Sequence, residues 1–237
     1  MQLDLFSLAV YVGGRPVREY GYDGRTYVPG KSLKDYSVRV VSRSPRRVKA
    51  VVSVDGLNVI DGKPAGLGGS GYILNPYSAL DIPGWRLTDD EVAMFRFGAT
   101  EASYAASKGK AENVGVIGAA FFDEVPPKPP AVVGLAAVRP RGPAVSKGGH
   151  APSPTAPGTY GGSLGTGFGP KTDHVVKRAE FDARPTPSAV IELRYEDAAI
   201  LRGLGLDVDD DADLVHAPAA FPEGGAGYCS PPSNWRG

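Results

Sequence analysis

Two Asp-Gly pairs punctuate an apolar stretch, VVSVDGLNVIDG at residues 51–62. Carboxylates beside glycines can form a metal or phosphate loop, because carboxylate oxygens bind hard cations. A calcium loop needs carboxylates at alternating positions and a closing glutamate, and no such series starts at Asp55. Asp-Gly is also the dipeptide that tolerates positive φ at both central positions of a type I′ turn. The pattern therefore predicts two tight turns, at Asp55-Gly56 and at Asp61-Gly62, rather than a ligand site.

A second series of carboxylates, DVDDDAD at residues 207–213, places acids at alternate positions as a calcium loop does. Its sixth position is Ala212, where the sharp turn of such a loop requires glycine. Its twelfth position is Pro218, where the loop would close with glutamate. We therefore interpret residues 207–213 as part of a solvated acidic tail, with weak binding of a divalent cation as the alternative.

Two glycine-rich motifs have the spacing of known functional loops. GLGGSG at residues 66–71 matches G-x-G-x-x-G, whose glycines let a backbone approach a pyrophosphate at a helix N-terminus. Its flanks read as a turn before and a strand after, so we expect a loop and no dinucleotide cofactor. GGSLG at residues 161–165 matches the nucleophile elbow G-x-S-x-G, but it stands in a Pro/Gly-rich segment without βα units. We expect Ser163 to lie in a flexible loop.

The other candidates for metal or nucleophilic chemistry are isolated in the sequence. His150, His174 and His216 have no short metal-binding spacing, and nothing pairs them with a nucleophile. Cys229 is the only cysteine, so the chain can form neither an intrachain disulfide nor a zinc site made of cysteines. Since no acid–base pair or closed metal set assembles in its proper context, the sequence predicts a non-enzymatic protein without metal or cofactor.

A local basic patch follows one of the apolar runs. Its members are Arg39, Arg43, Arg46, Arg47 and Lys49. Charges in such a run usually lie on a solvated face, although they can also meet phosphates or an acidic partner. We take Arg43, Arg46 and Arg47 as candidate interaction residues, together with two apolar anchors near the C-terminus, Phe221 and Trp235.

Composition disfavours several classes of partner. Twenty-six Lys and Arg residues balance 26 Asp and Glu residues, so no global field favours nucleic acid or an anionic membrane. The N-terminus MQLDLFSLAVYVGG has no basic region and only a short apolar run, so it fits neither a signal peptide nor a spanning helix. We expect synthesis in the cytoplasm and protein partners, rather than a membrane or specific nucleic acid.

The hydrophobic pattern predicts an all-β fold. Short β-branched and aromatic runs are separated by Gly, Asp, Asn and Pro, and the 32 glycines and 22 prolines disfavour a helical bundle. Alternation in YSVRVVS, residues 36–42, predicts a half-buried strand with Tyr36, Val38 and Val40 on one face. Pro45 then predicts a turn, so that residues 36–54 form an antiparallel hairpin.

Two segments are candidates for short helices. Thr88 and Glu91 have the spacing of a capping box, which predicts a short helix over residues 88–94, although Phe95 and Phe97 alternate as in a strand. SYAASK, residues 103–108, is either a second helix or a loop.

The predicted organisation has four parts. Residues 1–125 form an antiparallel β-sandwich or jelly-roll-like domain, and residues 126–171 form a Pro/Gly-rich arm or loop. Residues 172–205 supply strands that complete the sheet, as a late hairpin made of 174–181 and 189–195. Residues 206–237 form an acidic, Pro/Gly-rich tail.

Several sequence blocks resemble a group of bacterial and phage-borne β-rich proteins to which no function is assigned. These blocks are VVSVDGLNVIDG, IPGWRLTDDEVAMFRFG, SYAA followed by NVGVIGAAFF, and LGTGFG. The resemblance covers the first half of the chain and residues 164–206. It implies a common fold, and it brings no catalytic, metal-binding or cofactor-binding residue.

These observations favour a structural role. A β-sandwich with a long arm and tail, balanced charge and no catalytic set is typical of parts that decorate or cement a large protein shell. The composition suits a phage of a GC-rich host, so we expect a virion component that contacts other subunits, including copies of itself, through its arm and tail. The alternative is a cytosolic bacterial β-module that binds a ligand or a carbohydrate.

Overall fold

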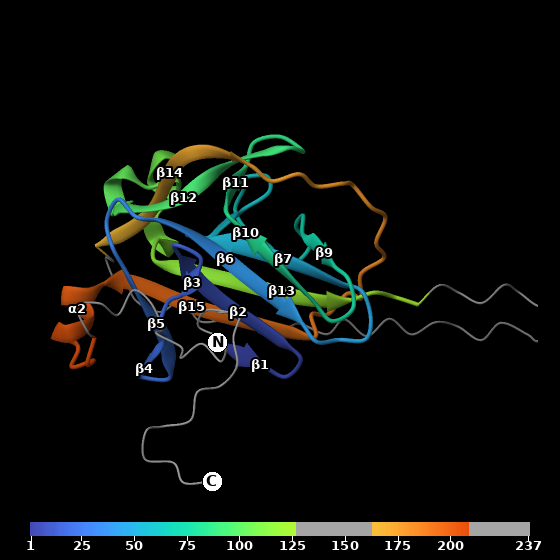
Figure 1. Cartoon of the computed structure of the whole chain (residues 1–237), viewed down its shortest axis with the longest axis horizontal. Helices are drawn as coiled ribbons and strands as arrows, with labels where there is room; N and C mark the ends of the chain where they lie inside the picture. Colours follow the sequence, from blue (N-terminus) through green and yellow to red (C-terminus); the bar gives the residue numbers. More distant parts are fainter. Residues whose placement is uncertain (127–162, 209–237) are drawn as a thin grey trace, which may run out of the picture.

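The computed structural model describes residues 1–126 and 163–208, which form an all-β, sandwich-like fold of two sheets (Figure 1). The first sheet contains β1 (Gln2–Leu3), β2 (Phe6–Val12), β3 (Arg15–Pro16), β6 (Asp35–Ser42), β10 (Ser78–Ile82), β11 (Gly84–Arg86), β12 (Glu91–Ala99) and β14 (Leu164–Asp173). The second sheet contains β4 (Tyr20–Tyr22), β5 (Arg25–Gly30), β7 (Val48–Val54), β8 (Leu57–Asn58), β9 (Tyr72–Leu74), β13 (Val116–Asp123) and β15 (Ala189–Asp197). The short helices are α1 (Tyr104–Ser107), α2 (Ala198–Gly203) and two 3-10 turns, Thr100–Ala102 and Ala111–Asn113.

Strand order mixes segments that are far apart in the sequence. The first sheet runs β1-β2-β6-β12-β11, with β10 on β6, β14 on β12 and β3 on β2. The second runs β4-β5-β15-β13-β7-β8, with β9 on β7. The β5–β15 pair is parallel, and the other strand pairs within the described residues are antiparallel. The predicted all-β class is confirmed, whereas jelly-roll-like connectivity stays a prediction.

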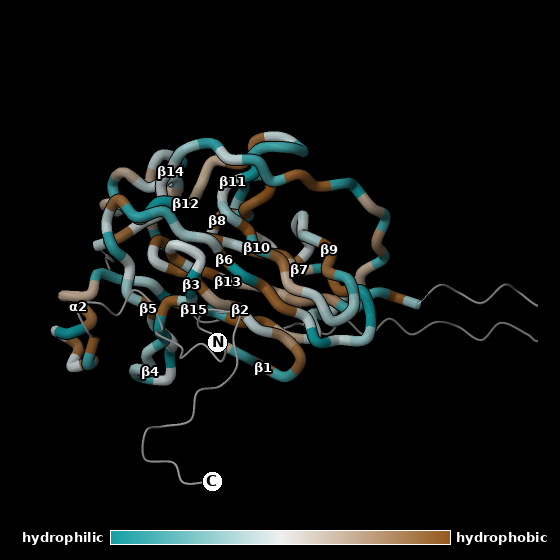
Figure 2. Tube along the Cα trace, viewed as in Figure 1, coloured by the Kyte–Doolittle hydropathy of each residue, from teal (hydrophilic) through white to brown (hydrophobic). Residues whose placement is uncertain are grey.

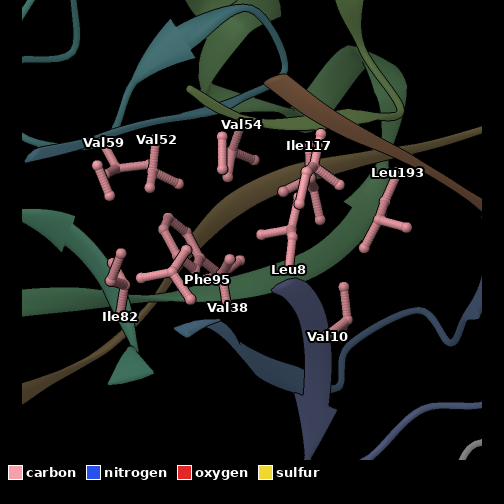
Figure 3. Close-up of a cluster of buried hydrophobic side chains, with 14 of the residues drawn as sticks. Leu8, Val10, Val38, Val52, Val54, Val59, Ile82, Phe95, Ile117 and Leu193 are labelled. Carbon is pink, nitrogen blue, oxygen red and sulfur yellow. The ribbon is translucent and has the colours of Figure 1, made fainter. Parts of the chain in front are cut away.

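One main hydrophobic core lies between the sheets. In β6 the side chains of Tyr36, Val38 and Val40 are buried while their neighbours in the strand are partly exposed, which confirms the predicted alternation. Val38 of the first sheet and Val52 of the second point toward each other across the interior (Figure 3). Hydrophobic residues concentrate on the central strands, and polar residues on the connections around them (Figure 2).

The predicted hairpin over residues 36–54 is wrong, although both of its strands form. β6 belongs to the first sheet and β7 to the second. The chain therefore passes from one sheet to the other between them, and the two strands do not pair. Each strand has one face of buried side chains. Because the two strands face each other across the core, the buried side chains of both strands are removed from solvent. Serine hydroxyls hold the crossover: Ser42 accepts from the Ser44 amide (3.3 Å), and Ser44 from the Arg46 amide (3.2 Å).

The predicted helix over residues 88–94 is also wrong. The Thr88 hydroxyl accepts from the amides of Asp90 (3.2 Å) and Glu91 (3.0 Å), as a helix cap would, but it closes the turn between β11 and β12. The strand alternation of Phe95 and Phe97 therefore prevails over the capping signal. The second candidate does form a helix, because α1 begins after Ser103, whose hydroxyl accepts from the Ala106 amide (3.1 Å).

The late hairpin over residues 174–181 and 189–195 is wrong in its first strand. β14 lies earlier, at Leu164–Asp173, so regular structure begins inside the segment that was predicted to be an arm up to residue 171. The glycines that suggested a linker have a packing reason: a Cβ on Gly165 would lie 2.6 Å from the Ser103 Cβ. Residues 127–162 of the predicted arm and 209–237 of the predicted tail lie outside the described residues.

No helix within residues 1–126 and 163–208 has the length and apolar character needed to cross a bilayer.

Candidate functional site

The turn at Asp55-Gly56 forms as predicted. Asp55 (φ +52°) and Gly56 (φ +73°) both adopt the left-handed conformation and join β7 to β8. At the second pair only Gly62 has positive φ, and Asp61 instead accepts a hydrogen bond from the Lys63 amide (3.0 Å). The second turn is therefore not a type I′ turn, in contrast to the prediction.

The Asp55 side chain does more than make a turn, because it lies fully buried in a polar network. It accepts hydrogen bonds from the amides of Gly115 (3.0 Å) and Thr166 (2.8 Å) and from the Tyr195 hydroxyl (2.5 Å). The Thr166 hydroxyl hydrogen-bonds the hydroxyls of Tyr36 (2.6 Å) and Tyr195 (2.8 Å). The network thus ties β6 and β14 of the first sheet to β15 and the β7–β8 turn of the second.

This network has the residue types of an acid–base site but is closed to solutes. Burial raises the pKa of Asp55 to about 6, against the lowering effect of its hydrogen-bond donors. Burial, with the nearby Asp55 charge, also raises the pKa of Tyr36 and of Tyr195 well above the ordinary value. All four side chains are buried, so the network is structural. Sequence reasoning missed it because its members come from four separate segments.

Stability should depend on pH through Asp55. Its folded pKa of about 6 exceeds the ordinary 3.8, so the folded state binds this proton more tightly than the unfolded state does. The contribution is fully present below the unfolded pKa and is lost as pH rises to about 6, by about 3 kcal/mol in total. Urea denaturation from pH 4 to 7 should reveal this fall when wild type is compared with Asp55→Asn.

Other titrating groups make stability rise with pH. The effect of Asp55 is therefore measured as the difference in the free energy of unfolding between wild type and Asp55→Asn at each pH. The guanidinium of Arg47 lowers the pKa of Glu124, so that pair favours folding at higher pH. An NMR titration of the Asp55 carboxyl should give a midpoint near pH 6. A midpoint near the ordinary value, with a pH-independent stability difference, would show that burial does not perturb this carboxyl.

His174 and Ser163 do not form a nucleophile–base pair. The Arg86 guanidinium donates to the His174 carbonyl (2.7 Å) and contacts the ring Nδ1, and burial together with this charge lowers the pKa of His174. Ser163 hydrogen-bonds the Glu196 carboxylate (2.6 Å) directly before β14, whereas a nucleophile elbow joins a strand to a helix. Neither residue therefore supports reading the G-x-S-x-G motif at residues 161–165 as the nucleophile elbow of a hydrolase.

The GLGGSG loop leads into strand β9 rather than into a helix, which agrees with the loop predicted there. A Cβ on Gly71 would lie 2.7 Å from the Ala50 carbonyl oxygen, so this glycine permits close approach to β7. Across residues 1–126 and 163–208, no three His, Cys, Asp or Glu side chains gather as metal ligands would. Of the carboxylates at 207–213, those from residue 209 on lie outside the described part.

The structure divides the basic run. Arg39 forms a two-point ion pair with Asp81 (2.6 Å at both contacts), and Arg47 forms one with Glu124. Arg43 and Arg46 are exposed, and neither makes an ion pair with another residue in the described part of the chain. Of the three predicted interaction arginines, Arg47 is therefore paired with a carboxylate, whereas Arg43 and Arg46 have none among the described residues.

Arg43 lies at one end of the sandwich beside two exposed apolar side chains, and the exposed Arg46 follows three residues later in the connection from β6 to β7. β2, β6 and β10 are neighbours there, which aligns Leu5, Arg43 and Tyr77 just beyond the paired ends. The Arg43 amide donates to the Leu5 carbonyl (2.8 Å). Leu5 is 46% exposed and Tyr77 is 71% exposed. We call Leu5, Arg43, Arg46 and Tyr77 the end platform.

The backbone holds Tyr77 in an unfavourable conformation. Its φ of +53° lies in the left-handed region, which is rare for a bulky residue. The Tyr77 amide donates to the Ser44 carbonyl (3.1 Å), and the Ser78 hydroxyl donates to the Asn75 carbonyl (2.7 Å), so the turn is fixed on both sides. Residues in strained backbone conformations cluster at binding and active sites, so the conformation of Tyr77 makes it a candidate contact residue.

The sequence named only part of the end platform. It singled out Arg43 and Arg46 but not Tyr77 or Leu5. The turn sequence NPYS at residues 75–78 was the available signal, since it places a large aromatic in a turn. The other two proposed anchors, Phe221 and Trp235, lie outside the described residues. Comparison of the chain with protein-family models, with curated proteins and with solved structures gave no match.

Proposed function

We propose that this protein is a non-enzymatic assembly protein that docks through its end platform onto an acidic surface of another protein subunit. The observation that carries the proposal is the exposed Tyr77 ring, held at positive φ beside Arg43. Arg43 and Arg46 are both exposed, and neither makes an ion pair with another residue in the described part of the chain. Tyrosine and arginine are the residue types that most often dominate binding energy at protein interfaces. A rigid platform also limits the entropy lost on docking.

The finer proposal is that the assembly is a virion, in which the protein decorates or cements the shell, as a homo-oligomer with jelly-roll-like connectivity. It is supported by the sandwich-like build, the balanced charge of the whole chain and the composition expected of a phage of a GC-rich host. Arm and tail contacts, including Phe221 and Trp235, belong to this finer proposal.

The outer face of the first sheet is the candidate surface for the carbohydrate-binding alternative, and it supports that alternative less well than the end platform supports assembly. The shallow hollow there has a volume of about 490 Å³ and includes Tyr11, Arg39 and Asp81. Sugar recognition would need a free aromatic face, but the Arg39 guanidinium lies 4.1 Å from the centre of the Tyr11 ring. We therefore keep the end platform as the candidate interface.

Charge reversal at the platform should abolish association without unfolding the protein. The double variant Arg43→Glu/Arg46→Glu replaces two exposed cations that make no ion pair among residues 1–126 and 163–208, so we expect stability to change by less than about 1 kcal/mol. Its association with large particles in lysates of the native cells should fall at least about 100-fold. Sedimentation through a density gradient, with quantitative immunodetection of each fraction, measures the loss.

Arg15→Glu/Arg184→Glu is the matched control, since both arginines are exposed outside the platform and the net-charge change is the same. This control should sediment like wild type. If both variants lost particle association equally, the loss would reflect the change in total charge and not the position of the arginines. If neither variant lost association, the platform would have no role in docking.

A further inference from the structure

A groove of about 710 Å³ lies beneath the connection from β14 to β15. Because β14 belongs to one sheet and β15 to the other, this connection must cross the edge of the sandwich. Figure 1 shows it as the extended orange segment that arches away from the strands. We call residues 174–182 the strap. The Val176 amide donates to the Asp89 carbonyl (2.9 Å), and the Asp182 carbonyl accepts from the Val125 amide (2.7 Å), so the strap is held near both ends.

The inner part of the groove is apolar. Ile60, Leu80 and Val176 line it, and each is partly buried against the main core. The Tyr72 side chain, which is largely buried, contributes a ring to the same wall. An apolar body seated here would extend the core toward solvent and remove further apolar surface from water.

The rim of the groove has an excess of positive charge. Its charged lining residues are Arg47, Arg86, Lys177, Arg178 and Asp89. Two of these cations have carboxylate partners, since Arg47 pairs with Glu124 and Arg178 lies 3.4 Å from Asp89. The second pair is exposed and therefore contributes little.

The other two cations, Arg86 and Lys177, make no ion pair within residues 1–126 and 163–208. The Arg86 guanidinium is held by neutral acceptors, among them the Tyr72 hydroxyl (3.2 Å) and the His174 carbonyl (2.7 Å). A half-buried cation whose hydrogen-bond acceptors are neutral favours an anion, because desolvation of its charge is otherwise uncompensated.

We infer that the groove binds a small organic carboxylate, with its head at Lys177 and Arg86 and its apolar body against Ile60, Leu80 and Val176. The volume is in the range of sites that enclose small molecules, and an apolar lining with a few polar groups is their usual composition. This site is independent of the end platform, so either proposal can fail without the other.

Titration calorimetry with 1-naphthoate tests the inference on the full-length protein. We expect saturable binding with one site per chain and a dissociation constant below about 1 mM. The neutral analogue 1-naphthalenemethanol should bind at least about tenfold more weakly, because it has the same apolar body without the charge. Inorganic phosphate, an anion without an apolar body, should show the same weakening.

Lys177→Glu should weaken naphthoate binding at least about tenfold, whereas Lys110→Glu, an exposed lysine away from the groove, should leave it unchanged. In NMR spectra, naphthoate should shift the amides of Ile60, Leu80 and Val176 first. The inference is overturned if naphthoate does not bind at about 1 mM. It is also overturned if the neutral alcohol binds equally, if both lysine variants behave alike, or if the shifted amides lie elsewhere.

Discussion

Asp55→Asn should lower the free energy of unfolding by about 4 kcal/mol, the range for removing one partner from a buried charged network. Asparagine has nearly the same shape and tolerates the φ of +52° that Asp55 adopts, so the backbone of the turn is preserved. The loss comes from the hydrogen bonds. Both carboxylate oxygens accept from backbone amides, and an asparagine NH₂ at either position would face the amide of Thr166 or of Gly115.

Urea denaturation of wild type and Asp55→Asn at pH 7, with both free energies extrapolated to water, measures the loss. Asp61→Asn is the control, since Asp61 is an exposed aspartate in the following turn and accepts one amide bond that asparagine can still accept. It should change stability by less than about 0.5 kcal/mol. If Asp55→Asn were as mild as this control, the network would not be what joins the two sheets.

Gly84→Ala should be comparably severe, at about 4 kcal/mol, because the added methyl group has no room. A Cβ on Gly84 would overlap the carbonyl oxygen of Ala93, which precedes Met94, the residue paired with Gly84 in β12. That carbonyl belongs to the backbone and cannot move as a flexible side chain would. β11 must therefore shift away from β12 and disturb the buried Trp85 beside it.

Gly98→Ala is the matched control within β12, since a Cβ there meets no atom within 4 Å. It should change the melting temperature only slightly, whereas Gly84→Ala should lower it by many degrees in the same calorimetric scan. A Gly84→Ala protein with wild-type stability would show that β11 is loosely held, in conflict with the register of this strand pair.

The sequence predicts strands well where the signal is local. Alternation placed Tyr36, Val38 and Val40 inward, and Asp55-Gly56 formed the expected turn, because side-chain periodicity and turn propensity depend on neighbouring residues. The partner of each strand depends instead on contacts between distant segments. That is why β6 and β7 were joined in a hairpin that the structure does not contain.

Composition misled where glycine serves packing. LGTGFG at residues 164–169 was read as an arm because glycine is frequent in linkers, yet Gly165 and Gly169 lie in β14 at close contacts with neighbouring segments. Of the end platform, only the two arginines could be predicted from the sequence. Arg43 and Arg46 are visible in the sequence. The absence of an ion pair at Arg43 within the described residues and the exposure of Tyr77 depend instead on how three strands end together.

The most direct test of the proposed role is site-specific photo-crosslinking at the end platform in the native cells. Benzoylphenylalanine replaces Tyr77 in one variant and Leu33 in the other. Leu33 is the matched control, because it is 76% exposed, also has positive φ (+65°) and precedes the opposite end of β6.

After irradiation, the Tyr77 variant should crosslink to one protein of a fast-sedimenting particle, and the Leu33 variant should not. The crosslinked peptide should have an acidic surface sequence, and Arg43→Glu/Arg46→Glu should abolish the product. A Tyr77 variant that stays a free monomer without a crosslink, or that gives the same products as the Leu33 variant, would contradict an assembly role for the end platform.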